Sequence, residues 1–255
     1  MTLALDHVGF IVPDLAATSA LLEALGFSLS ARAEHTRTLP TGEVVPAGSA
    51  QRSLMLDEGY IEFMEIFDPS AGHMLAQAGS DRHGLHILAL GTTHAQATHA
   101  ACTATGVPVG PVMDWRRAVD EAGVRGLASF RFFGAADWHP ADPSYLCWVQ
   151  HLTPELLRPA HLLRHANAAQ ALVGLAYEGD AAWARRLRDA GAPASVTFSP
   201  GPGPARATAL TLRFAALDAV IGAARRCGIA VTPEPGGAWL DLRAALGLRW
   251  RCVAA

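Results

Sequence analysis

The chain has 255 residues, of which 51% are hydrophobic and 17% are charged, so it is long and apolar enough to fold as one large domain or two smaller ones. Acidic residues exceed basic ones by only three, which predicts no basic surface for nucleic acid or for an anionic membrane. All 20 basic residues are arginine. The lack of lysine excludes Schiff-base chemistry, a pyridoxal-phosphate anchor and a Walker-type phosphate loop.

The four cysteines are interpreted as buried thiols. They form no CxxC pair and no zinc-ribbon spacing, and a chain of this size does not depend on disulfides. The start of the chain lacks a basic segment followed by an apolar run, and no stretch reaches the roughly 18 apolar residues that a membrane helix needs. We therefore expect a cytoplasmic protein without a membrane partner.

A repeated unit organises the chain. Its first copy has a strand over residues 5–12, a helix from Leu15 to Leu25 capped by Asp14, and a terminating Gly26. Its second copy has a strand over 85–90, Thr92 or Thr93 as cap, a helix through 103 and a terminating glycine at 106. On this alignment His7 and His86 occupy the same place.

Two further copies follow in shortened form. The third has a strand over 172–177 and a helix over 181–190, and the fourth has a strand over 209–214 and a helix that ends near residue 226. Each of the first two helices is followed by strand-like runs, over 52–56 and 59–67 and over 128–133 and 145–151. This order predicts an α+β fold of paired βαβββ modules, in which a curved mixed sheet forms a cup with helices on its outer face. We expect a complete pair over residues 1–158 and a reduced pair over 168–255.

Strand alternation selects the side chains that face into the cup. If His7 points inward, Asp6 and Val8 face the helices. The same argument turns Glu62 inward in its strand. In the later copy it places His86 with Leu88 and Leu90, and Gln150 with Trp148. The inward set is then His7, Glu62, His86 and Gln150, which is a plausible open site for divalent zinc, nickel, manganese, cobalt or iron.

The runs LDHVGFIVPDLAATSALLEALGF, YIEFMEI and LHILALGTTHAQATHAACTATGVPVG resemble the vicinal oxygen chelate superfamily, which includes glyoxalases, bleomycin-resistance proteins and ring-opening dioxygenases. The run QHLTPELLRP resembles a stretch of a glyoxalase-like subgroup. The resemblance implies metal ligands at His7, Glu62 and His86. The last ligand of the family is usually Glu, but the matching position here is Gln150, and a bulge would turn His151 inward instead.

The resemblance also implies the function. Family members use the metal to grip adjacent oxygens of a substrate, and Glu62 could double as a catalytic base. Two imidazoles and one carboxylate also match the ferrous triad of dioxygenases. We expect a metal-dependent lyase, isomerase or dioxygenase acting on a small oxygen-rich substrate. The alternative is a metal-free protein that binds or sequesters a small molecule in the same cup.

Two residues outside the ligand set are candidates for substrate contact. Trp148 shares the parity of Gln150 and belongs to an aromatic cluster that suits an apolar or ring-bearing substrate. Arg131 could meet a substrate carboxylate, and an exposed edge position is equally consistent with the sequence. His161 and His165 are spaced to share a helix face, and hydrogen bonding at a domain junction is the favoured role. Residues 168–255, which contain no histidine, are expected to cover the cavity or to form a homodimer contact.

Overall fold

The structure is a computed structural model and describes residues 3–76, 83–121 and 123–255. Two βαβββ modules build its first sheet. The first module consists of β1 (Ala4–Ile11), α1 (Leu15–Ala24), β2 (Ala33–Thr38), β3 (Val44–Met55) and β4 (Tyr60–Ile66). The second consists of β5 (Gly84–Gly91), α2 (Ala95–Ala104), β6 (Met113–Glu121), β7 (Val124–Gly134) and β8 (Tyr145–His151).

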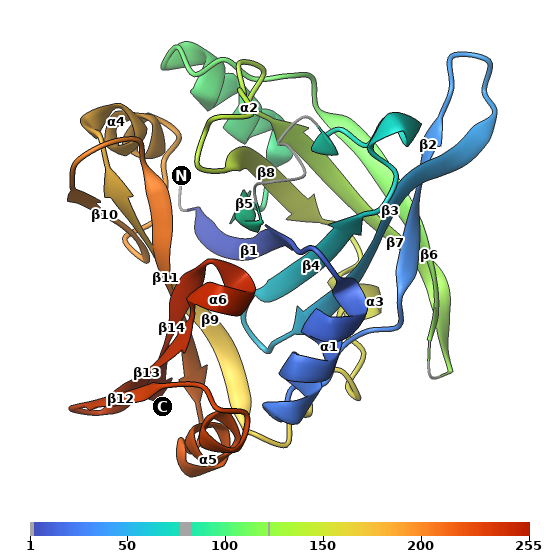
Figure 1. Cartoon of the computed structure of the whole chain (residues 1–255). Helices are drawn as coiled ribbons and strands as arrows, with labels where there is room; N and C mark the ends of the chain where they lie inside the picture. Colours follow the sequence, from blue (N-terminus) through green and yellow to red (C-terminus); the bar gives the residue numbers. More distant parts are fainter. Residues whose placement is uncertain (1–2, 77–82, 122) are drawn as a thin grey trace.

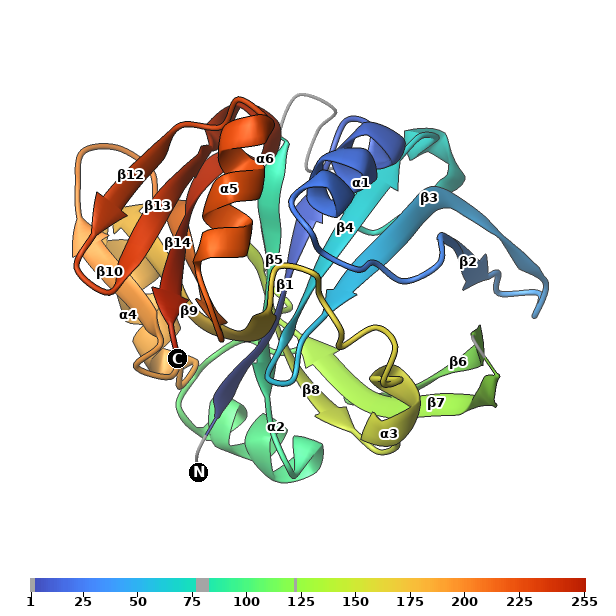
Figure 2. The same cartoon turned by 90° about the horizontal axis from the view of Figure 1, so that it is seen from below.

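The eight strands have the order β2-β3-β4-β1-β5-β8-β7-β6, so the first strands of the two modules lie side by side at the centre. β1 pairs with β4 in parallel and with β5 antiparallel, and β5 pairs with β8 in parallel. Figure 2 shows this sheet curling into an open half-barrel with β2 and β6 at its free edges. The predicted α+β class and the curved sheet of paired modules are confirmed.

A second, six-stranded sheet follows in the order β10-β9-β11-β14-β13-β12. Its elements are β9 (Ala169–Gly179), α4 (Ala181–Asp189), β10 (Val196–Pro200), β11 (Arg206–Phe214), α5 (Asp218–Arg226), β12 (Val231–Glu234), β13 (Gly237–Leu242), α6 (Arg243–Leu246) and β14 (Leu248–Ala254). The third module therefore keeps only β9, α4 and β10, whereas the fourth has its full set of strands. Figure 1 shows this sheet beside the half-barrel.

The helices begin and end at the residues that the sequence marks for these roles. Asp14 accepts a hydrogen bond from the backbone N–H of Ala17 (2.8 Å), and Asp180 caps α4 in the same way through Ala182. Gly26 and its counterpart Gly106 end α1 and α2 with φ values of 88° and 79°. The start of α2 differs from the expectation, because the cap position is His94, whose side chain makes no capping bond.

One apolar core runs through both sheets. It contains Val8 and Phe10 of β1, Leu88 of β5, and Leu210 and Trp250 of the second sheet. The two sheets share this core. The division into one domain over residues 1–158 and another over 168–255 stays a prediction. Within the described ranges, no helix combines the length and the apolar character needed to cross a bilayer.

The concave face of the half-barrel carries a separate apolar cluster, which includes Ile11, Met64, Ala89, Cys147 and Val149. The chain segment after β8 packs against the end of the half-barrel where β1 begins. This segment contains α3 (Pro154–Leu157), and its Leu162 packs against Met55 and Tyr60. The candidate site lies at this end.

Candidate functional site

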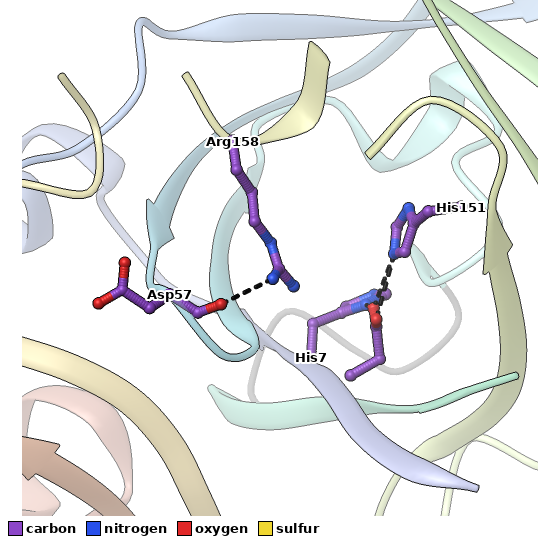
Figure 3. Close-up of polar contacts among 5 residues, drawn as sticks. His7, Asp57, His151 and Arg158 are labelled. Carbon is purple, nitrogen blue, oxygen red and sulfur yellow. Dashed lines mark hydrogen bonds and ion pairs between the residues drawn. The ribbon is translucent and has the colours of Figure 1, made fainter. Parts of the chain in front are cut away.

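A carboxylate bonded to two imidazoles forms the centre of the site. Asp6 Oδ2 lies 2.7 Å from His7 Nδ1 and 3.0 Å from His151 Nε2. The Asp6 and His7 side chains are each 11% exposed, and that of His151 is 17% exposed. Figure 3 shows the His151 ring directed at the carboxylate that lies beside His7.

The geometry fixes the ionisation of the carboxylate and the tautomers of both rings. Burial alone would raise the pKa of Asp6, but the hydrogen bonds from His151 and His7 hold this pKa well below its usual range. An ionised carboxylate only accepts hydrogen bonds, so His7 donates from Nδ1 and His151 from Nε2. In their neutral forms, the opposite nitrogens, His7 Nε2 and His151 Nδ1, then carry lone pairs.

Asp6 reaches this position through an irregularity in β1. Pairing with β5 shifts between Leu5 and His7, so Asp6 is the extra residue of a bulge. The expectation that Asp6 faces the helices is wrong for this reason, because regular alternation does not hold across a bulge. The charge of Asp6 is directed to the two histidines.

The last strand of the second module has the opposite parity to the one expected. Gln150 Oε1 accepts a hydrogen bond from the backbone N–H of Ala95 (3.0 Å) at the start of α2, so Gln150 faces the outer helix layer. Tyr145, Cys147 and Val149 face the concave side, and β8 pairs with both neighbours without a register shift. The prediction of Gln150 as an inward ligand is wrong. His151 faces inward by plain alternation, without the bulge that the sequence argument required.

Glu62 and Tyr60 lie on the concave side of β4, as the sequence predicts for Glu62. His7 pairs with Tyr60 and Gly9 pairs with Glu62. The His7 and Tyr60 rings stack with centroids 4.2 Å apart. Burial, together with the charges of Asp6 and Glu62, raises the pKa of Tyr60 well above its usual value, so Tyr60 stays neutral. The assignment of Glu62 as a catalytic base stays a prediction.

His86 is not the structural counterpart of His7. Ile87 pairs with Tyr145 as His7 pairs with Tyr60, and Ala89 pairs with Cys147 as Gly9 pairs with Glu62. The two terminating glycines give the same offset, 106 − 26 = 80, whereas His86 lies only 86 − 7 = 79 residues after His7. His86 is instead the residue at a register shift in β5 and is buried at 4% exposure.

The places that correspond to His7 and Glu62 in the second module therefore hold Ile87 and Cys147. Burial raises the pKa of the Cys147 thiol, and the charges of Asp6 and Glu62 raise it further, so this side chain is not a thiolate. Across the described part of the chain, no three His, Cys, Asp or Glu side chains are placed to hold one metal ion. The side chains of His7, Glu62, His86 and Gln150 therefore do not come together as the predicted metal site.

Neither predicted substrate contact borders the site. Trp148 is fully buried, stacks on Phe133 with centroids 4.9 Å apart, and donates from Nε1 to the carbonyl oxygen of Ala190 (3.3 Å). Arg131 pairs in register with Gln150, shares its outward face, and forms an ion pair with Asp114 (2.9 Å). Both assignments fail for the same reason as that of Gln150, because the even residues of β8 and the odd residues of β7 face outward.

Two cavities have Ala4 and Asp6 in common in their linings, His151 lines the smaller of them, and His7 lies behind Asp6 and lines neither. One has a volume of about 400 Å³ and is lined by Ala4, Leu5, Asp6, Glu58, Gly59, Arg158, Leu172, Val173 and Ser195. The other has a volume of about 380 Å³ and is lined by Ala4, Asp6, Gly91, Thr92, Thr93, Val149, Gln150 and His151. These volumes are within the range of small-molecule sites. β9 of the second sheet supplies Leu172 and Val173, and Ser195 comes directly before β10, so this part of the chain contributes a wall of the site.

Sequence reasoning missed Asp6, Tyr60 and Arg158 as residues of this site. The offset of the terminating glycines aligns His7 with Ile87 and could have shown that the second module lacks a matching histidine, but no local signal marks the bulge at Asp6. No local signal marks Arg158, which reaches the cavity from the segment after α3. His165 has the junction role that was favoured, because its ring bonds the backbone N–H of Ser28 (3.0 Å) and the carbonyl oxygen of Met55 (2.8 Å).

Comparison with known families and structures agrees with this architecture. The sequence matches the glyoxalase-like domain family over residues 5–191, which is most of the chain. The chain belongs to this family. Its fold is that of the vicinal oxygen chelate superfamily, as the sequence resemblance predicted. No curated protein sequence matches the chain.

Several solved structures share the fold at low sequence identity. A hypothetical protein from Staphylococcus aureus is 10% identical with a TM-score of 0.62, and the match covers 99% of this chain and 100% of the other. A catechol 2,3-dioxygenase is 13% identical with a TM-score of 0.60, covering 98% and 87%. A halotolerant catechol dioxygenase is 14% identical with a TM-score of 0.57, covering 99% and 86%. At these identities the likeness establishes the fold alone.

Proposed function

We propose that this glyoxalase-like protein is an isomerase or lyase that transfers a proton on a small carbonyl compound, with His7 as the base. The observation that carries the proposal is the Asp6 carboxylate, which lines two cavities and is hydrogen-bonded to two imidazoles. A base oriented by a buried carboxylate is the usual arrangement for a histidine that accepts a proton. Because the donor set does not fit the predicted metal centre, the mechanism has no metal-dependent step.

The chemistry follows from the assigned tautomers. His7 Nε2 takes a proton from the carbon next to the substrate carbonyl, and the electron pair of the broken C–H bond moves onto the carbonyl oxygen as an enolate. Asp6 stabilises the imidazolium that forms on His7. Return of the proton to a neighbouring atom completes an isomerisation, and loss of a leaving group from the adjacent carbon completes a lyase reaction. His151, held by the same carboxylate, offers Nδ1 as a second proton acceptor.

The proposal is tested by hydrogen exchange, which needs no knowledge of the natural substrate. A panel of small 2-hydroxy ketones, 2-oxo acids and 1,3-dicarbonyl compounds is incubated with the protein in D₂O, and loss of the C–H signal is followed by NMR. We expect catalysed exchange of at least one compound. Loss of a general base costs about 10²- to 10⁴-fold, so His7→Gln should lower the rate by at least about 100-fold.

The control is His139→Gln, which changes an exposed histidine outside both cavities and should keep the parent rate. Exchange by His7→Gln at the parent rate would overturn the proposal. Compounds that bind the parent without any catalysed exchange would support the alternative function, a protein that binds or sequesters a small molecule.

A further inference from the structure

Arg158 carries an unneutralised charge at the wall of the larger cavity. Its Nη1 donates to the backbone carbonyl oxygen of Asp57 (2.9 Å), which is a neutral partner. Its Nε is buried and has no hydrogen-bond partner. Across the residues that the structure describes, no carboxylate forms an ion pair with Arg158. A buried guanidinium N–H without a partner is costly, so an oxygen ligand at this edge would be stabilising.

The two carboxylates at this cavity already have partners. Glu58 forms an ion pair with Arg213 (2.6 Å), and Asp6 accepts hydrogen bonds from His7 and His151. Arg158 is therefore the charged side chain of this lining whose partner is a neutral backbone oxygen. Figure 3 shows the guanidinium extending from the chain above toward the space beside His7 and His151.

The form of the guanidinium indicates which anion fits. With Nη1 held by Asp57, the Nε and Nη2 edge is left for a ligand, and this edge presents two parallel N–H groups. A carboxylate matches two such donors with its two oxygens. The remaining walls of the cavity combine the aliphatic side chains of Leu5, Leu172 and Val173 with the polar residues Asp6, Glu58 and Ser195. An alkyl chain next to the carboxylate would contact the aliphatic side chains.

We infer that Arg158 binds the carboxylate of a small aliphatic carboxylic acid, which is the substrate class of the site. This inference rests on the proposed function, because Asp6, which holds His7 and His151, lines the same cavity as Arg158. Binding through both donors requires the Arg158 side chain to turn, because its Nε is buried. The acid is held at one end by the arginine, and its body extends along the aliphatic wall toward the histidine pair.

The test measures binding by calorimetry with 2-hydroxyhexanoate and with its uncharged primary amide. The parent should bind the acid at millimolar concentration or below and bind the amide at least tenfold more weakly. Arg158→Met should lose this preference. Arg158→Lys, which keeps the positive charge but not the two parallel N–H donors, should keep part of it. The matched control is Arg131→Met, which removes an arginine on the outer face and should bind as the parent does.

Equal affinity for acid and amide, no binding of the acid to the parent, or unchanged affinity in Arg158→Met would each overturn the inference. The acid-to-amide comparison on the parent stands even if Arg158→Met does not fold. Calorimetry on the parent separates this inference from the proposed function, because it detects acid binding whether or not the protein catalyses proton exchange. Selective acid binding that depends on Arg158, without proton exchange by the parent, would support this binding site and overturn the proposed enzymatic function.

Discussion

The two modules of the half-barrel share one backbone plan but carry different chemistry on the concave face. The first places His7, Tyr60 and Glu62 where the second places Ile87, Tyr145 and Cys147. The outer strands differ in the same way. His35, Ser49 and Gln51 form a hydrogen-bonded group in the first module, whereas Trp115, Phe130 and Phe132 form an aromatic group in the second.

The comparison indicates how a site can become asymmetric in a duplicated fold. A ligand set built symmetrically from two modules needs polar residues at equivalent places in both. Here the second module supplies its polar group from the end of β8, where His151 reaches Asp6. The site therefore lies at the end of the half-barrel where β1 begins, and not in the middle of the concave face.

The largest effect is expected from removing the Asp6 carboxylate, which connects His7 of the first module to His151 of the second. Asp6→Ala leaves two imidazoles without their acceptor, and hydrogen bonds to charged groups contribute about 1.5–3 kcal/mol each. We expect the free energy of unfolding at pH 7 to fall by about 3 kcal/mol, measured by chemical denaturation. Asp14→Ala, which removes only a helix cap, should cost about 1 kcal/mol. Equal losses in the two variants would contradict the central role of Asp6.

The second prediction introduces polar side chains into the second module at the positions that correspond to His7 and Glu62. The double substitution Ile87→His and Cys147→Glu should create a zinc site with His7 and Glu62. Zinc at 100 times its dissociation constant should then raise the free energy of unfolding by about 2.7 kcal/mol. Adding His7→Ala should abolish this gain. Similar zinc stabilisation of the parent, removed by His86→Ala, would show instead that the alignment of His7 with Ile87 is wrong.

The third prediction concerns how the stability of the first module depends on acid pH through His73, which lies beside His35. Burial and the nearby charge of His35 lower the pKa of His73 to about 4, against about 6.5 in an unfolded chain. Between these values the unfolded state binds more protons, so stability is present above pH 6.5 and is lost as the pH falls toward 4. His73→Gln should flatten the dependence of the unfolding free energy on pH in this window. Parallel curves for parent and variant would contradict the assignment.

The smallest effect is expected at the residue that the sequence proposed as a ligand. Gln150→Leu removes one hydrogen bond to the backbone at the start of α2, so the free energy of unfolding should fall by about 1 kcal/mol. Gln150 lines the smaller cavity, but its amide oxygen bonds the start of α2 and not the histidine pair, so proton exchange should keep the parent rate. A loss of exchange as large as that of His7→Gln would place Gln150 in the site after all.

Regular local signals were enough to predict the modules and their helices. Asp14, Asp180 and the terminating Gly26 and Gly106 act through backbone geometry within a few residues, so their roles can be inferred from the sequence. The inward position of Glu62 followed from the burial pattern of its strand, because one face of β4 is aromatic and apolar. These inferences need no information about distant residues.

The site itself depended on features that alternation cannot give. The register shifts at Asp6 and His86 break the period of two, and a shift of one residue exchanges the two faces of a strand. For β8, Trp148 was taken as an inward residue, but its large ring packs into the core between the sheets. Arg158 comes from a connecting segment whose path is set by tertiary packing. Its role could not be predicted from the local sequence.

The most direct test of the account is the protonation of the two histidines, observed by ¹⁵N NMR of the imidazole rings at neutral pH. Because Asp6 accepts from both, we predict that His7 carries its proton on Nδ1 and that His151 carries its proton on Nε2, with both assignments lost in Asp6→Ala. A His7 ring protonated only on Nε2 would leave no lone pair directed away from Asp6 and would contradict the account.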